Sequence, residues 1–441
     1  MKKIVLSLFV FAISANIVAA DHVMAATKRA PEKEVPTTLN LSLQEAQDYA
    51  VAENRSLRNA DLAVQKAYAT RWQTIASMLP SVDMSWAYQS MMGYKMNFGG
   101  MPIEMPDNGT FGITASVGIN GQAIVGALLN NTAIEMQKLN LEISEDNLRA
   151  NVKSSYASVL VLEDVVKLLD SSLKNIENLA AMTQRSVEVG AAEQTTADQI
   201  LVRVNTLKNN INANKRSTQL ALNALKVLLN VPAETELTLT TQLTDMLSAE
   251  AILTLLGQDF VLENNLSYQT LAKNVELAKK NVHMAGWAYG PTIGVGYQYS
   301  EKDYFGKKEG FNMTPPNALS IQISMPLWSS GKRAAGVVEK KIALEEARNT
   351  FEETSDNLGI QNEQLRYNLQ NAFETYTNEQ ENIAVTQRVF DNTSRKFQQG
   401  VASNLDLVNA SNDLITAQST YVQAVLTLVN AEVELEKFLN L

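Results

Sequence analysis

The stretch from Leu319 to Leu327 alternates apolar and polar residues, and a very long helical pattern follows it directly. Its apolar members are Leu319, Ile321, Ile323, Met325 and Leu327. A period of two is typical of a β-strand with one apolar face. After Gly331 the period becomes helical and continues as far as Gly400, whereas helices of globular proteins run for about 8–20 residues. A two-faced strand that leads into so long a helix leaves few architectures open.

Three other stretches show the same alternation. Their apolar residues are Val82, Met84, Trp86 and Tyr88; Ile113, Ala115, Val117 and Ile119; and Ile293, Val295, Tyr297 and Tyr299. The four predicted strands form two β-hairpins, over residues 82–120 and 292–327. Strands of about 9–11 residues with one apolar and one polar face are typical of a membrane β-barrel. The alternative is that they are edge strands of a soluble β-sandwich.

The first residues have the layout of a secretory signal peptide. Two lysines precede an apolar run from Ile4 to Ile13, and small residues follow. We expect a signal peptide over residues 1–20, with cleavage as late as Ala26 as the alternative, and then a mobile lead over 27–41. No later stretch has 18 consecutive apolar residues, and the chain has no cysteine. An exported chain of this kind can span a membrane only by forming a closed β-barrel.

Long helical hairpins are predicted after each strand pair. No proline or glycine occurs from Leu128 to Val189, which predicts a helix of roughly 90 Å. Its heptad seam consists of Leu162, Val166, Leu169, Leu173, Ile176 and Ala180. Gly190 ends this helix, and a second one is expected from about Thr195 to Leu229. In the same way, Gly400 lies between the long helix that begins at Lys332 and a last helix.

The chain contains an internal repeat. Asn54, Val64, Ala67 and Pro80 correspond to Asn265, Val275, Ala278 and Pro291, and Gly190, Leu225 and Leu229 correspond to Gly400, Leu435 and Leu439, at an offset of about 210 residues. Each repeat is predicted to consist of a helix, a β-hairpin and a long helical hairpin. Repeat 1 covers residues 42–230 with its tip near 190, residues 231–264 form an equatorial connector, and repeat 2 covers 265–441 with its tip near 400. The first helix is expected from Leu43 to about Met78.

Four strands cannot close a barrel, because the smallest outer-membrane barrels have about eight. Open edges in lipid would leave backbone groups without hydrogen bonds, so several copies must contribute. The predicted fold is mainly α with a membrane β-barrel contribution, in which a homotrimer forms a barrel of twelve strands and an α-helical periplasmic tunnel. The expected junctions between barrel and helices are Pro80, Pro291, Pro326, Trp328 and Gly331.

Several short motifs point to a known family. They are the opening Leu41-Ser42-Leu43-Gln44-Glu45-Ala46, the segment Met325-Pro326-Leu327-Trp328 before Gly331-Lys332-Arg333, and the tips Gly190 and Gly400 with Leu405-Asp406-Leu407-Val408. In these residues and in its architecture the mature chain resembles the TolC-type family of outer-membrane efflux proteins. The resemblance implies a trimeric channel in the outer membrane of a Gram-negative bacterium, with a periplasmic helical extension.

The same resemblance implies partners. The periplasmic tip would dock to a periplasmic adaptor protein and an inner-membrane pump of the resistance-nodulation or ABC type. Gly190, Ala192, Gly400 and Ala402 are the candidate docking residues at the tip. After the second strand, residues 119–124 lack the proline-aromatic-glycine signature that is present at 326–331.

Three carboxylates are candidate gate or lumen residues. Asp406 matches a position that is often acidic in the family, and we add Asp413 and Asp198. Acidic rings at the mouth of a tunnel favour cations and can hold a gate closed through hydrogen bonds. The alternative is that these carboxylates are solvated on a helix face.

Composition argues against other functions. The net charge of −10 is spread evenly, which argues against a nucleic-acid partner. Phosphate-binding loops, nucleophile elbows and metal-spaced clusters are absent from the sequence, so we predict no enzymatic activity and no cofactor. Six methionines fall in the first predicted strand and its loop: Met84, Met91, Met92, Met96, Met101 and Met105. Thioethers suit Cu(I), whereas lipid packing and an adaptable loop explain them without a metal.

The predicted function is that of a passive exit duct of a tripartite efflux system, which carries small molecules such as drugs, toxic compounds or metal ions. An exit duct for type I protein secretion is one alternative, because both processes use similar ducts. The alternative from another class is an exported coiled-coil scaffold without a pore, which would contain helices alone.

Overall fold

The computed structural model describes residues 37–90, 92–104, 106–190, 192–305 and 315–440. The predicted signal peptide, most of the predicted lead, Met91 and Met105 lie outside these residues. Most of the described residues are helical, which confirms the mainly α class. The chain divides into two compact units. The sheet unit contains Leu62–Lys138 and Thr270–Glu352, and the helical unit contains the described residues up to Asp61, Leu139–Gln269 and the residues from Glu353 onward.

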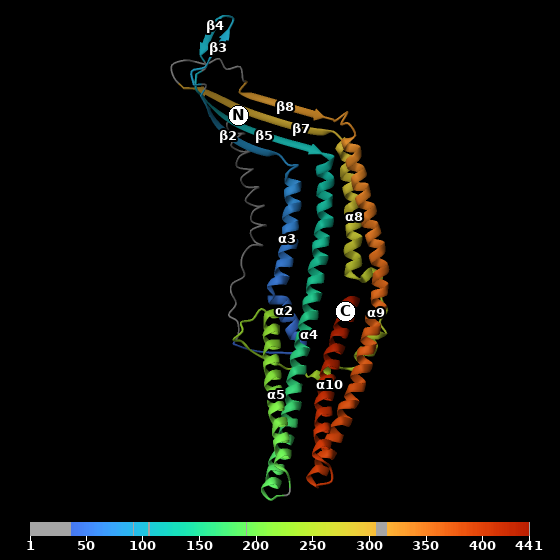
Figure 1. Cartoon of the computed structure of the whole chain (residues 1–441). Coiled ribbons are helices and arrows are strands. Elements are labelled where there is room, and N and C mark those ends of the chain that lie inside the picture. The colour runs from blue at the N-terminus through green and yellow to red at the C-terminus, as the bar shows by residue number, and fades with distance from the viewer. Residues whose placement is uncertain (1–36, 91, 105, 191, 306–314, 441) are drawn as a thin grey trace. The chain divides into compact units, whose positions relative to one another are not determined.

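The sheet unit is built on a four-stranded antiparallel sheet. Its strands are β2 (Ser81–Gln89), β5 (Asn108–Asn120), β7 (Thr292–Tyr304) and β8 (Asn317–Ser324), which lie side by side in the order β2-β5-β7-β8 (Figure 1). Two short strands, β3 (Lys95–Phe98) and β4 (Met101–Glu104), pair separately. Because β2 and β8 are the outer strands of the larger sheet, each has one edge without a partner strand among the described residues.

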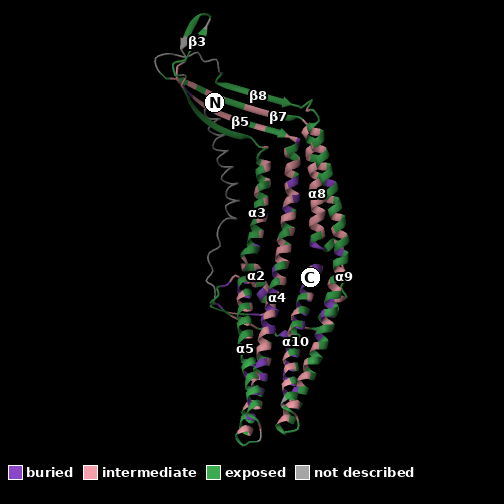
Figure 2. Cartoon of the chain, in the orientation of Figure 1, coloured by how far each residue is buried: buried purple, intermediate pink, exposed green. Residues whose placement is uncertain are grey.

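The strand register aligns apolar residues on one face of this sheet. Val82 pairs with Ala115, Ala115 with Tyr297, and Tyr297 with Leu319, so these four residues form one row across all four strands. Directly opposite residues in antiparallel strands point to the same face. The neighbouring row on the other face is Ser81, Ser116, Gly296 and Ser320. Every residue of β2 and β8 is exposed, as Figure 2 shows for β8.

Helices adjoin the strands with almost no linker. They are α3 (Arg55–Ala76), α4 (Gly121–Glu188), α8 (Leu266–Gly286) with the short 3₁₀ helix η2 (Trp287–Tyr289), and α9 (Lys332–Gln398). The first helix of the pair was expected at about Leu128, but α4 begins at Gly121. Asn120 explains the earlier start, because its Oδ1 accepts a hydrogen bond of 2.7 Å from the Ala123 amide. A Cβ on Gly121 would lie 2.1 Å from the indole of Trp287, so only glycine fits there.

The helical unit contains two helical hairpins (Figure 1). In one, α4 is followed by α5 (Gln194–Leu228), and in the other α9 is followed by α10 (Asn404–Leu439). Gly190 and Gly400 lie in the two turns with φ angles of +74° and +72°, a conformation that glycine adopts without the steric penalty of a Cβ. Within the described ranges, no helix is long and apolar enough to cross a lipid bilayer.

Short elements connect the helical hairpins. Strand β1 (Thr38–Leu41) pairs in parallel with β6 (Glu236–Leu239), and α2 (Leu43–Glu53) follows β1. Beyond β6 come α6 (Leu243–Met246), α7 (Ala249–Leu256) and the 3₁₀ helix η1 (Leu262–Asn264). Ser42 and Glu45 form the predicted capping box at the start of α2. Strand β1 falls in the segment that was expected to be a lead, because its partner strand is distant in the sequence.

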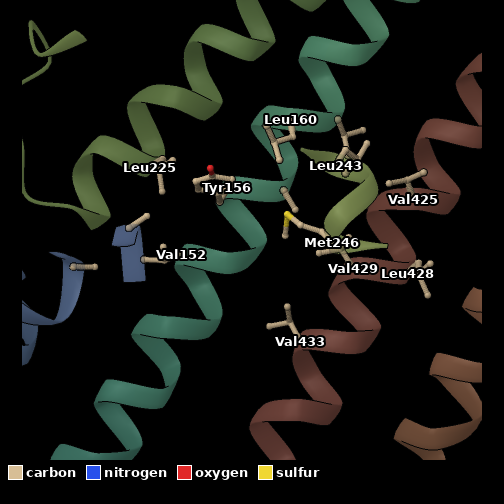
Figure 3. Close-up of a cluster of buried hydrophobic side chains, with 14 of the residues drawn as sticks. Val152, Tyr156, Leu160, Leu225, Leu243, Met246, Val425, Leu428, Val429 and Val433 are labelled. Carbon is tan, nitrogen blue, oxygen red and sulfur yellow. The ribbon is translucent and has the colours of Figure 1, made fainter. Parts of the chain in front are cut away.

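Two apolar clusters stabilise the helical unit. The larger one joins α2, α4, α5, α6, α7, α9 and α10, and ten of its residues are labelled in Figure 3: Val152, Tyr156, Leu160, Leu225, Leu243, Met246, Val425, Leu428, Val429 and Val433. Tyr156 is fully buried, and its hydroxyl donates to the Leu41 carbonyl at 2.9 Å and accepts from the Thr241 amide at 3.1 Å. The hydroxyl therefore ties the β1–β6 pair to α4. The second cluster lies nearer to the two hairpin turns, around Leu207.

The helix predicted from Leu43 to about Met78 is in fact two helices, because Asn54 interrupts it. Asn54 has an extended backbone, and its Oδ1 accepts hydrogen bonds from the Ser56 and Leu57 amides at the start of α3. Its Nδ2 donates to the Leu228 carbonyl at 2.8 Å. Asn230 makes the reciprocal hydrogen bond: its Nδ2 donates to the Glu53 carbonyl at 3.0 Å.

The same arrangement occurs once more. Asn265 Oδ1 accepts from the Ser267 and Tyr268 amides at the start of α8, and its Nδ2 donates to the Phe438 carbonyl at 3.0 Å. Asn440 Nδ2 donates to the Asn264 carbonyl. Asn230 and Asn440 also share a left-handed backbone, with φ angles of 56° and 57°. We call these four residues, Asn54, Asn230, Asn265 and Asn440, the asparagine clasps.

We predict that replacing a clasp residue lowers stability. Asn54→Ala and Asn265→Ala each remove a helix cap and a hydrogen bond to a carbonyl, which costs about 1–2 kcal/mol. Asn265→Ala is expected to cost more, because Asn265 is buried and its partner carbonyl would lose its bond away from water. Thermal unfolding of the detergent-solubilised protein, followed by circular dichroism, measures the loss. Asn212→Ala, on an exposed part of α5, is the control, and an equal loss there would contradict the role of the clasps.

Candidate functional site

The predicted docking residues lie at the two hairpin turns. Gly190 and Gly400 donate backbone hydrogen bonds of 2.9 Å to the Val187 and Phe397 carbonyls. Ala192 and Ala402 donate to carbonyls one step earlier on α4 and α9, at 3.2 and 3.3 Å. The backbone hydrogen bonds of Gly190 and Ala192 therefore match those of Gly400 and Ala402.

Both turns present apolar surface. Val189 is 80% exposed beside Gly190, and Val401 is 73% exposed beside Gly400. Leu405, in the first turn of α10, is also exposed. Sequence reasoning identified the glycines as tips and named Leu405 in the tip motif but missed Val189 and Val401, although an apolar residue next to a tip glycine is visible in the sequence.

The three candidate gate carboxylates have separate surroundings. Asp406 forms a capping box at the start of α10, where its Oδ2 accepts from the Ser403 amide at 2.9 Å and from the Ser403 hydroxyl at 2.7 Å. These hydrogen bonds lower the pKa of Asp406. Asp198 accepts from the Gln194 side chain at 2.8 Å, and Asp413 is exposed on α10. Asp406 thus stabilises its own helix, and the Ser-x-x-Asp pattern could have revealed this role.

The predicted junction residues lie where strands meet helices. Pro80 and Pro291 directly precede β2 and β7, and residues 325–331 connect β8 to α9. Ser330 and Gly331 turn the chain there with φ angles of +47° and +80°.

Arg333 holds this connection together, which sequence reasoning missed. Its Nη1 donates to the Pro326 carbonyl at 2.5 Å and its Nε donates to the Ser329 hydroxyl at 2.9 Å. Its guanidinium lies 4.9 Å from the ring centre of Tyr289, at the start of the connection to β7. One side chain therefore joins two strand–helix connections.

A partly buried ionic network joins α4 to α10 and was also missed. Lys153 Nζ lies 2.8 Å from Glu432 Oε1 and 2.7 Å from Glu436 Oε2. Burial opposes the charge of Lys153, but the two carboxylates together raise its pKa. Burial also raises the pKa of Glu432, and the attraction of Lys153 offsets this only in part. The second carboxylate oxygen of Glu432 is buried without a hydrogen-bond partner.

Lys153 and Glu436 also line a cavity of about 250 Å³ with residues of α2, α4 and α10, among them Gln44, Asp146 and Arg149. The described residues contain no group of three or more histidine, cysteine, aspartate or glutamate side chains that could hold a metal ion. His283 lies on α8.

An open antiparallel sheet with one apolar face, joined to long helical hairpins, defines a class of outer-membrane channel protein. The family described as "Outer membrane efflux protein" matches residues 47–231 and 259–441. The chain belongs to this family of outer-membrane efflux proteins.

Known relatives agree with this assignment. Over 428 residues the chain is 23% identical to the "Probable efflux pump outer membrane protein TtgC" of Pseudomonas putida. The aligned region covers 90% of this chain and 83% of TtgC. It is 23% identical over 301 residues to the "Outer membrane efflux protein BepC" of Brucella suis. The aligned region covers 66% of this chain and 63% of BepC. The match therefore spans less than two thirds of BepC.

Solved structures agree on the fold. The crystal structure of CusC superimposes with a TM-score of 0.74 at 16% identity, over 94% of this chain and 95% of CusC. The resemblance to TolC-type channels inferred from the sequence is confirmed, and the protein is located in the outer membrane, with a periplasmic helical part.

We predict that Lys153→Met destabilises the helical unit by about 3 kcal/mol at neutral pH, because it leaves the buried carboxylate of Glu432 without its cation. Without Lys153 the pKa of Glu432 rises further. The folded state then takes up a proton that the unfolded state releases, so the loss shrinks as the pH falls to about 5. Unfolding in detergent at both pH values measures this difference.

Two further variants test the assignment. Adding Glu432→Gln to Lys153→Met is expected to recover part of the loss at neutral pH. Lys167→Met removes an exposed ion pair with Asp164 and is expected to change stability by less than about 1 kcal/mol. A loss for Lys153→Met that does not depend on pH would contradict the ionic origin.

Proposed function

We propose that three copies of the chain form a closed barrel and a helical tunnel, and that the assembly is the passive exit duct of an efflux system. The observation that carries this proposal is the four-stranded sheet. Its apolar residues align on one face, and β2 and β8 each have one edge that no other described strand pairs with. In lipid, such edges would leave backbone donors and acceptors unsatisfied.

The strand order supports edge-to-edge closure. Neighbouring strands are antiparallel throughout β2-β5-β7-β8, so β8 of one copy runs antiparallel to β2 of the next. Three copies then continue one antiparallel pattern through twelve strands, a number that leaves an open lumen. In this arrangement the apolar face contacts lipid and the polar face lines the lumen.

The polar face suits passive transport. Its rows consist mainly of small or uncharged residues, such as Ser81, Ser116, Gly296 and Ser320. A lumen wall of this kind leaves space for water and solutes and forms no tight binding site for one particular solute. Membership of a family of efflux proteins supports the prediction that the chain is not an enzyme.

The asparagine clasps support two structural repeats. Asn54 and Asn265 make equivalent hydrogen bonds at the starts of α3 and α8, and the turns at Gly190 and Gly400 share one pattern. We therefore retain repeats over residues 42–230 and 265–441, joined by a connector over 231–264. A signal peptide over residues 1–20 would direct export.

The hairpin turns are the proposed docking surface. Gly190, Ala192, Gly400 and Ala402 would meet a periplasmic adaptor, which links the duct to an inner-membrane pump. The exposed Val189 and Val401 supply apolar area for this contact. Asp406, Asp413 and Asp198 remain proposed gate residues. Small molecules such as drugs, toxic compounds or metal ions are the proposed substrates, in line with membership of a family of efflux proteins. A scaffold of helices alone does not fit the four-stranded sheet.

Crosslinking in cells tests the proposed function. A photoreactive amino acid at Ala192 or Ala402 is expected to capture an adaptor together with a resistance-nodulation pump. The matched control is the same amino acid at Ser217, which is exposed on α5 away from the turn. Capture with an ABC transporter would favour the protein-secretion alternative. No adaptor at either turn, or equal capture at Ser217, would contradict docking at the tips.

A further inference from the structure

We propose that a cavity in the helical unit binds a small aliphatic amine through its ammonium group. The cavity has a volume of about 250 Å³ and is lined by residues of α2, α4 and α10. It has room for a molecule of roughly eight heavy atoms, if each takes the volume of one water molecule in the liquid. The proposal does not depend on the exit duct, because every lining residue belongs to one compact unit of a single copy.

Asp146, on α4, supplies the negative charge that this ligand would meet. Its carboxylate lines the cavity and forms no hydrogen bond or ion pair with any other residue that the structure describes. Burial raises the pKa of Asp146, and the neighbouring carboxylates of Glu142 and Glu145 raise it further, against an opposite effect of Arg149. A half-buried carboxylate without a partner is unfavourable. A cation bound beside Asp146 would therefore stabilise its charged form.

The cations that line the cavity do not neutralise Asp146, because other carboxylates already hold them. Arg149 and Lys153 each form ion pairs with two carboxylates, and Lys437 forms one with a single carboxylate, at distances of 2.7–3.1 Å. These three cations are outnumbered by their own acidic partners, and Asp146 adds to the excess of negative charge. The local charge therefore favours a cationic ligand over an anionic one.

The amide side chains that line the cavity still have acceptors to offer. The amide nitrogens of Gln44, Gln47 and Asn440 donate to other groups of the protein. Their amide oxygens accept no hydrogen bond from the described residues. A primary ammonium group has three donors and no acceptor. It therefore complements the carboxylate of Asp146 together with these oxygens, whereas a carboxylate or phosphate ligand would bring only further acceptors.

The lining also favours an organic cation over a metal ion. Ala150 and Val433 contribute apolar surface beside the polar groups. A short alkyl chain gains free energy when it leaves water for such a surface, whereas a metal ion needs a shell of oxygen, nitrogen or sulfur ligands. Within the described ranges, no three potential metal-binding side chains come together. An aliphatic amine uses both the apolar and the polar parts of the lining.

Isothermal titration calorimetry of the full-length protein in detergent tests the proposal, with 1,4-diaminobutane as the probe. Sodium chloride keeps the ionic strength constant, so that general charge screening does not change. The control ligands are 1,4-butanediol, which is of similar length but uncharged, and magnesium chloride, which has the same charge but no alkyl chain. Asp146→Asn is the test variant. Glu142→Gln is its matched control, because Glu142 is exposed on the same helix and does not line the cavity.

We expect 1,4-diaminobutane to bind the unchanged protein and Asp146→Asn to weaken this binding at least about tenfold, because the substitution removes a charge-assisted hydrogen bond. Glu142→Gln is expected to change the affinity less than about twofold, since exposed charges are well screened. Asp146→Asn is expected to leave the unfolding temperature unchanged or higher, because the carboxylate it removes has no partner among the described residues. A loss of binding would then not reflect a loss of fold.

Three results would overturn the proposal. The first is an absence of binding to the unchanged protein. The second is an equal loss in both variants, which would mean that the general charge of the helices attracts the diamine. The third is binding of Mg²⁺ or of the diol as tight as that of the diamine, because the site would then not select an ammonium group. None of these results bears on the exit duct, which the crosslinking experiment tests separately.

Discussion

The edges of β2 and β8 that have no partner strand among the described residues are the constraint on which the rest of the structure depends. Backbone donors and acceptors in lipid need partners, since no water is present to replace them. The sheet has an apolar face suited to lipid, yet alone it leaves two rows of such groups unsatisfied. In the proposed assembly a closed ring of copies would satisfy both edges at once, and the symmetry that closed the strands would also arrange the helical hairpins around one axis.

The two halves of the chain use equivalent asparagine clasps, but their strand-to-helix connections are stabilised by different contacts. The clasps of Asn54 and Asn265 cap α3 and α8 and bond to the last turns of α5 and α10 in the same way. By contrast, β5 passes into α4 through the cap of Asn120 and the close contact at Gly121, whereas β8 reaches α9 through a turn held by Arg333.

Local patterns made much of this fold predictable. The alternation at Ser81–Gln89 and the tip glycines Gly190 and Gly400 are properties of short segments. Features that depend on distant partners were missed. The side chain of Asn54 bonds to a carbonyl 174 residues away, and Lys153 meets carboxylates 279 and 283 residues away. The role of Asp406 as a cap was visible locally, but the resemblance drew attention to a gate instead.

The most direct test of the central claim is disulfide trapping between strand edges of neighbouring copies. Ser320→Cys on β8 would be combined in turn with cysteine at Ser81, Asp83 or Ser85 on β2, all on the polar face of the sheet. A barrel shared by three copies predicts that at least one combination yields a covalent trimer and no larger product. The pair of Ser320→Cys with Met84→Cys, whose side chains point to opposite faces, is expected to stay monomeric. The absence of crosslinks in all three combinations, or a ladder of longer polymers, would contradict a closed trimeric barrel.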